Sequence, residues 1–164
     1  MMPVEPSVWP LQRDLIAFYG DPRIPGWLAG NTTFVVCPWP LNMGTIPITH
    51  ILIHQKCADS LTRVLNATWN AVGEDRDKII LYRYNRFSGS YAPRPMRGGS
   101  AMSVHWFAAA VDFDDADNEQ HHLQHLFLDT SPLVQAFKNE GWVWGGDWSP
   151  ASVDAMHFQA ARVY

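Results

Sequence analysis

The sequence predicts an α+β domain in which a small antiparallel sheet packs against helices. The strongest helical signal lies at residues 55–72, where apolar residues recur every three or four positions, as on the buried face of an amphipathic helix. Runs rich in β-branched or aromatic residues at 32–36, 48–53 and 79–84 are typical of strands. Because no internal repeat or linker divides the chain, we expect a single domain over residues 1–164.

Turn and capping signals place the remaining elements. Residues 10–19 begin with proline, carry an apolar stripe and precede a glycine, and residues 131–139 begin with Ser-Pro and precede a glycine, so both segments are predicted helices. The Pro- and Gly-rich residues 37–47 are predicted to form a loop, and the charged residues 75–78 an exposed turn. Residues 85–100 form an irregular segment with three arginines, which suits either a solvated loop or an anion clamp.

Composition narrows the class of protein. Hydrophobic residues make up 47% of the 164-residue chain and charged residues 17%, as in a globular protein. The net charge of −4 gives no basic stripe, which argues against nucleic acid as a partner. No run approaches the roughly 18 apolar residues of a membrane span, and residues 1–10 lack the apolar core of a signal peptide. We therefore expect synthesis in a cytoplasm without an export signal.

Two cysteines, Cys37 and Cys57, match no CxxC metal or redox motif. Two reduced, buried thiols are the simpler interpretation, since free cysteine is often buried. A disulfide between them stays open at this stage.

A tryptophan-rich stretch near the C-terminus indicates a site. Residues 141–148 hold three tryptophans and a glycine pair, and Asp154 and His157 follow. Upstream, His105 and Asp112 complete a set of imidazoles and carboxylates. A catalytic zinc ion takes three ligands of these types and keeps a fourth position open. Since His105 and Asp112 are seven residues apart, the chain must bend between them for both to reach one ion.

These residues resemble the motifs of the M15 zinc peptidases, a family that includes D-Ala-D-Ala carboxypeptidases and the L-alanyl-D-glutamate endopeptidases of phage endolysins. The resemblance rests on three motifs in the family's order: Arg94-Pro95-Met96-Arg97-Gly98, Ser103-x-His105-x6-Asp112, and Trp144-Gly145-Gly146-Asp147-Trp148 followed by Asp154-x-x-His157. The first motif is similar to a segment of the endolysin-like subgroup. The resemblance implies a DD-peptidase/hedgehog-like fold, with the small sheet carrying the metal site.

The resemblance also implies a role for each residue of the motifs. It implies one Zn²⁺ ion per chain, held by His105, Asp112 and His157. Asp154 is then the general base, and Arg94, with Arg97 as the second choice, stabilises the oxyanion. Ser103 then binds substrate or orients the site. Trp144 and Trp148 are either core residues or a wall of the site that contacts substrate, and Tyr91 is a further candidate substrate contact.

Other polar residues of the same segments have simpler interpretations. Asp147 is predicted to cap a turn, and His121, His122 and His125 to lie on a polar surface. One residue departs from the family pattern: Ala108 stands where the family has glycine, which would be costly if the backbone there needs a positive φ.

The expected function is zinc-dependent hydrolysis of a peptide bond in the peptidoglycan stem peptide by an endolysin-type L-Ala-D-Glu endopeptidase. The alternatives are a D-Ala-D-Ala carboxypeptidase and a non-catalytic wall-binding or virion protein with the same fold. We expect a monomer with no nucleic-acid partner, which acts on the bacterial cell wall after its release from the cytoplasm.

Overall fold

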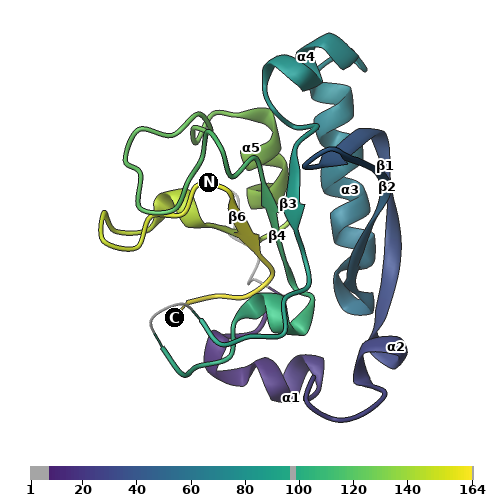
Figure 1. Ribbon diagram of the computed structural model, residues 1–164, viewed down its shortest axis with the longest axis vertical. Coiled ribbons are helices and arrows are strands. Elements are labelled where there is room, and N and C mark those ends of the chain that lie inside the picture. Colours follow the sequence, from purple (N-terminus) through teal and green to yellow (C-terminus); the bar gives the residue numbers. More distant parts are fainter. Residues whose placement is uncertain (1–7, 97–98, 164) are drawn as a thin grey trace, which may run out of the picture.

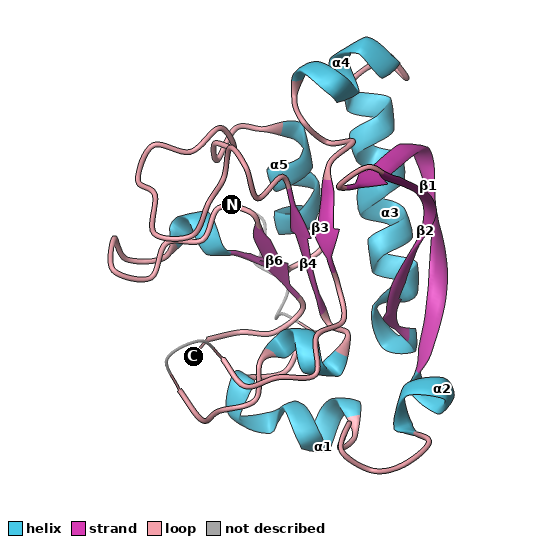
Figure 2. Cartoon of the chain, in the orientation of Figure 1, coloured by secondary structure: helices cyan, strands magenta, loops and turns pink. Residues whose placement is uncertain are grey.

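The computed structural model describes residues 8–96 and 99–163 and shows a mixed fold of helices and small antiparallel sheets (Figures 1 and 2). The helices are α1 (Leu15–Tyr19), α2 (Trp27–Asn31), α3 (Gln55–Ala71), α4 (Arg76–Leu81) and α5 (Pro132–Asn139). The strands are β1 (Thr32–Met43), β2 (Ile46–His54), β3 (Phe87–Gly89), β4 (Ala110–Phe113), β5 (Val143–Trp144) and β6 (His157–Gln159). Three short 3₁₀ helices are η1 (Gln12–Asp14), η2 (Val104–Phe107) and η3 (Gly145–Asp147).

The strands form two separate antiparallel sheets. β1 and β2 make a long hairpin, and the other strands make a four-stranded sheet in the order β3-β4-β6-β5. Helix α3 stands between the hairpin and the four-stranded sheet, and packs against β1 on one side and α5 on the other (Figure 1). Long loops project from the small sheet on the side away from α3 (Figure 2). No helix within the described residues is both long and apolar enough to span a membrane.

Helix α3 forms where the apolar periodicity predicts it. His54 precedes it, and the Nδ1 atom of that side chain accepts a hydrogen bond from the Lys56 backbone amide, which satisfies one of the free N–H groups of the first turn. Its apolar stripe includes Leu61 and Val64, which are fully buried. Gly73, which adopts a positive φ of 70°, follows the C-terminal end of the helix.

The predicted loop at residues 37–47 is wrong, because β1 and β2 continue almost to the two-residue turn at Gly44. Inward-facing side chains such as Trp39 and Leu41 keep alternating with exposed ones and remain buried. The register of the hairpin shifts between Val36 and Leu41, which accommodates two prolines that cannot donate hydrogen bonds to a regular ladder.

The predicted strand at residues 79–84 and the turn at 75–78 are also wrong, because helix α4 occupies residues 76–81. The Asp75 side chain accepts hydrogen bonds from the amides of Asp77 and Lys78 and so caps the first turn. A short amphipathic helix that buries Ile79 and exposes its neighbours then outweighs the β-propensity of the segment.

The N-terminal segment is held against the end of β6. The predicted helix at 10–19 is shorter than expected and consists of η1 and α1, whereas the predicted helix at 131–139 is confirmed as α5. The backbone N–H of Gln12 donates to the Arg162 carbonyl (2.8 Å), and the Tyr19 hydroxyl donates to the Ala160 carbonyl (2.7 Å). Both cysteines are free and buried.

Candidate metal centre

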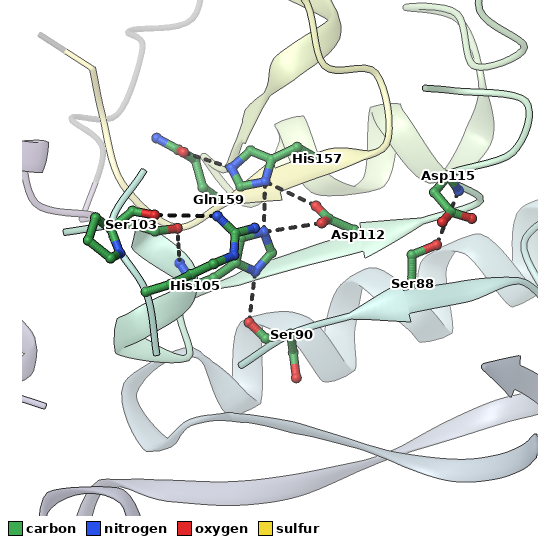
Figure 3. A network of polar contacts seen from close by, with 10 residues as sticks. Ser88, Ser90, Ser103, His105, Asp112, Asp115, His157 and Gln159 are labelled. Carbon is green, nitrogen blue, oxygen red and sulfur yellow. Dashed lines mark hydrogen bonds and ion pairs between the residues drawn. The ribbon is translucent and has the colours of Figure 1, made fainter. Parts of the chain in front are cut away.

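Three side chains predicted from the motifs meet at one point. His105 lies on η2, Asp112 on β4 and His157 on β6, and their candidate ligand atoms all lie within 4.8 Å of one another (Figure 3). Asp112 and His157 are direct partners in the β4–β6 register, so both side chains project from the same face of the sheet. Sheet pairing therefore brings together residues that are 45 positions apart.

A tight bend brings His105 over the same face. Ser103 accepts a hydrogen bond from the His105 amide (3.2 Å) and caps η2, and Ala108 ends η2 in the left-handed conformation with φ 51° and ψ 35°. This is the bend that the seven-residue spacing to Asp112 requires. Ala108 is fully buried and carries the positive φ that glycine would adopt without strain.

Hydrogen bonds on the far side of each imidazole set its tautomer. His105 donates from Nδ1 to the Ser90 carbonyl oxygen at 2.8 Å, so its Nε2 carries no proton and has a free lone pair. His157 donates from Nε2 to Oε1 of Gln159 at 2.8 Å, which leaves its Nδ1 as a lone pair. The two free nitrogens face each other 3.2 Å apart (Figure 3). Two lone pairs at this distance repel unless a cation or proton lies between them.

The donor set fits a tetrahedral metal ion. The Asp112 carboxylate lies 3.0 Å from His157 Nδ1 through one oxygen and 3.2 Å from His105 Nε2 through the other. Ligand atoms at bond lengths of about 2.0–2.1 Å from tetrahedral zinc are about 3.3 Å apart. Each histidine nitrogen lies at about this spacing from a different oxygen of Asp112, and a set of two neutral imidazoles and one carboxylate is typical of zinc.

The three side chains of the cluster shift one another's pKa values. Burial raises the pKa of Asp112, but hydrogen bonds and charge from His105 and His157 outweigh it, and the net pKa is lowered. Burial lowers the pKa of His157, but the Asp112 carboxylate outweighs it, and the net pKa is raised. Without a metal ion the cluster therefore favours a positive charge in the space between the side chains.

The cluster opens into a large groove of about 1280 Å³. The loop before η2 lines one part of the groove, and the loops after β4 and around η3 line other parts. Asp154 also lines it, and its Oδ1 is buried without a hydrogen-bond partner. Burial is the main cause that raises the pKa of Asp154, to about 6, against the opposing effect of His157. A carboxylate with these properties is suited to proton transfer near neutral pH.

The other predicted substrate contacts divide into those in the groove and those outside it. Arg94, Ser103, Tyr91 and Trp148 line the groove. The Arg94 guanidinium is exposed and donates to the Pro95 carbonyl at 3.4 Å, leaving most of its donors available. Arg97 lies outside the described residues.

The tryptophans of residues 141–148 do not form one wall. Trp148 lies with its ring centroid 5.4 Å from that of His157 and partly faces the groove. Trp144 is only 3% exposed and donates from Nε1 to the Ala155 carbonyl at 2.7 Å. Trp144 therefore belongs to the core that supports the site and does not reach the groove, contrary to the substrate-binding role expected of it.

The structure also places the residues that have simpler interpretations. The Asp147 carboxylate forms an ion pair with Lys138 at 2.7 Å. His121 and His122 are both exposed, as expected; His122 lies beside Glu119, and His121 also lines the groove. His125 Nδ1 donates to the Phe127 carbonyl at 2.6 Å, which ties the side chain to its own loop.

Two partners of the candidate ligands were missed by the motif-based reasoning. The Ser90 carbonyl, which accepts from His105, is a backbone group with no sequence signal. Gln159 could have been found, because it follows His157 by two residues on β6 and a strand places such residues on the same face.

The fold and the cluster define a mixed helix-and-sheet protein with a His-Asp-His group that could hold a metal ion. Residues 97–160, which contain all three members of the group, match an M15 peptidase family model described as D-alanyl-D-alanine carboxypeptidase. The resemblance to the M15 peptidases is thereby confirmed for the segment that carries the site, and it indicates a metallopeptidase. Neither the curated proteins nor the solved structures gave a match to the chain.

Proposed function

We propose that the protein is a zinc-dependent peptidase that cuts the L-Ala-D-Glu bond of the peptidoglycan stem peptide. The convergence of three lone pairs from His105, Asp112 and His157 at the floor of an open groove carries this proposal. The groove of about 1280 Å³ has room for a peptide segment beside the cluster.

In this proposal His105 Nε2, a carboxylate oxygen of Asp112 and His157 Nδ1 hold one zinc ion. Zinc, when bound, polarises the scissile carbonyl and lowers the pKa of a water molecule. Asp154 accepts a proton from the attacking water and passes it to the leaving amine. Its partnerless Oδ1 and raised pKa support this role.

The rest of the groove binds and orients the peptide. Arg94 stabilises negative charge on the carbonyl oxygen, with Arg97 as the alternative in the same loop. Ser103 orients η2 through its bond to the His105 amide. Tyr91 and Trp148 supply the apolar wall against which the substrate packs.

We also propose that residues 1–164 act as one peptidase domain and as a monomer at the bacterial cell wall. The hydrogen bonds that join Gln12 and Pro10 to Arg162 support the single domain, because they tie the N-terminal segment to the residues that follow the strand of His157.

Metal analysis and two variants test the metal site and the base. The purified protein is expected to hold one zinc ion per chain, and His105→Ala to lose it. Asp154→Ala is expected to keep zinc but to lose wall hydrolysis, because the metal ligands stay in place while the base is removed. An Asp154→Ala variant that cleaves peptidoglycan at the wild-type rate would show that another group acts as the base.

A second candidate is a D-Ala-D-Ala carboxypeptidase, which the description of the matching family model favours. Mass spectrometry of purified peptidoglycan after digestion separates the two. Cleavage at L-Ala-D-Glu frees stem peptides that begin with D-Glu, whereas a carboxypeptidase releases only free D-Ala. A protein that binds zinc and the wall but releases neither product would be the non-catalytic alternative.

A further inference from the structure

The amide side chain of Gln159 is buried beside the candidate metal centre, and only 2% of the residue is exposed. Its Oε1 lies 2.8 Å from His157 Nε2 (Figure 3). Burial of an amide is costly unless its donors and acceptor are paired, so a residue in this position is held by its partners.

The orientation of this amide is fixed from behind. Gln159 Nε2 donates to the Ala161 carbonyl at 3.0 Å and more weakly to Gln12 Oε1 at 3.4 Å. Since carbonyl oxygens only accept hydrogen bonds, the nitrogen of the amide must face Ala161, and the oxygen must face His157. A flipped amide would place an N–H group against the imidazole and leave two oxygens in contact at Ala161.

The fixed orientation of the Gln159 amide determines which nitrogen of His157 carries the proton. An acceptor at Nε2 keeps the imidazole proton on that nitrogen, so Nδ1 presents its lone pair to Asp112 and His105. The opposite tautomer would direct an N–H group into the cluster and block the position of a metal ion. We propose that Gln159 is a positioning residue that selects the metal-binding tautomer of His157, an inference that rests on the proposed zinc site.

The two histidines of the cluster are held in different ways. His105 is fixed by the backbone carbonyl of Ser90, which no side-chain substitution removes. His157 depends on a side chain, and the chain's own sequence can therefore tune it. Partners of this kind orient the ligand and raise its basicity, and their loss typically lowers metal affinity about 10–100-fold.

Zinc affinity measured by chelator competition tests the role of Gln159, with three variants compared with wild type. Gln159→Leu removes the acceptor and is expected to bind zinc about 10–100-fold more weakly. Gln159→Glu keeps an acceptor for His157 but loses the donor to Ala161, and is expected to lose less than about 10-fold in zinc affinity, the lower end of the loss for a removed partner. Gln120→Leu is the matched control, because Gln120 lines the same groove without a hydrogen bond to the cluster, and its affinity should equal that of wild type.

The Glu variant separates a positioning role from a merely structural one. If Gln159 only anchored the backbone at Ala161, Gln159→Glu and Gln159→Leu would lose zinc affinity together, and the inference would be overturned. It would also be overturned if Gln159→Leu bound zinc within about twofold of wild type, against the 10–100-fold expected for such partners.

Nitrogen NMR of the zinc-loaded wild-type protein gives an answer that does not depend on the folding of any variant. We expect a proton on His157 Nε2 and metal coordination at Nδ1. Coordination through Nε2 would overturn the role of Gln159 while leaving the peptidase proposal intact. A wild-type protein that binds no zinc would overturn both, and the first affinity measurement distinguishes these cases.

Discussion

Gly145 is the position where a single added methyl group should disturb the site most directly. It is buried at the start of η3, and a Cβ atom built on it would lie 2.2 Å from the Asp154 carbonyl oxygen and 3.1 Å from Asp154 Cβ. The obstacle is backbone, which cannot rotate away as a flexible side chain would. The two segments are also joined by a hydrogen bond from the Asp154 amide to the Gly145 carbonyl at 2.9 Å.

The expected cost of Gly145→Ala follows from these contacts. Overpacking of a closed site typically costs about 1–3 kcal/mol, and loss of the Gly145–Asp154 hydrogen bond adds roughly 1 kcal/mol. Alanine lowers the entropy of the unfolded chain, which stabilises the folded state by about 0.4–1 kcal/mol. We therefore expect Gly145→Ala to lower the free energy of unfolding by about 1–4 kcal/mol. Zinc affinity should fall as well, because the Asp154 carbonyl that must move also accepts from the His157 amide at 3.1 Å.

Urea denaturation of wild type, Gly145→Ala and Gly30→Ala measures this effect. Gly30 is the matched control, because it lies in α2 and nothing stands within 4 Å of its added Cβ. Gly30→Ala should be neutral or stabilising by up to about 1 kcal/mol, as expected for the same exchange within a helix. A Gly145→Ala protein with the wild-type denaturation midpoint and zinc affinity would refute the close packing of η3 against Asp154.

Three further predictions concern the buried thiols, the bend at Ala108 and the metal. Burial raises the pKa of Cys37 and Cys57 to about 12, so neither should react with a thiol reagent at pH 8 until the protein unfolds, when both should. Because the folded pKa exceeds the unfolded one, the stability that these thiols contribute is complete below about pH 8.5 and is lost as pH rises toward 12, which denaturation at pH 8 and pH 10 would detect. Ala108→Gly should change the free energy of unfolding by less than about 1 kcal/mol, because two effects oppose each other. Glycine relieves roughly 1–2 kcal/mol of left-handed backbone strain, but it removes a buried methyl group and makes the unfolded chain more flexible. A shift in the calorimetric melting temperature above about 4 °C would contradict this. A strong chelator should lower the melting temperature of the zinc-loaded protein and leave His105→Ala unchanged, because only a folded site contributes binding energy; equal shifts in both proteins would argue against His105 as a ligand.

Local chemistry in the sequence was sufficient for several elements. The apolar stripe of residues 55–72 and the Ser-Pro start of residues 131–139 predicted α3 and α5. Local chemistry was misleading at residues 79–84, where a cap at Asp75 and burial of Ile79 favour a helix over a strand. It was also misleading at residues 37–47, because prolines tolerated at a register shift look like a loop in sequence.

The motifs determined which residue types are available for a metal site, since His105, Asp112, Asp154 and His157 could all be named from their spacing and family resemblance. Which of them converge is a property of tertiary structure. The pairing of Asp112 with His157 depends on the β4–β6 register, and the approach of His105 depends on the left-handed turn at Ala108. Neither the register nor the turn is encoded in local propensity.

What the sequence by itself determined, then, is the fold class, the main helices and the identity of the candidate ligands, because these follow from periodicity, capping and short motifs. Only the tertiary structure decided that Trp144 supports the core while Trp148 faces the groove, and that Gln159 and the Ser90 carbonyl set the imidazole tautomers. The physical reason is that burial and hydrogen-bond partners depend on contacts between segments distant in the chain, which no local pattern specifies.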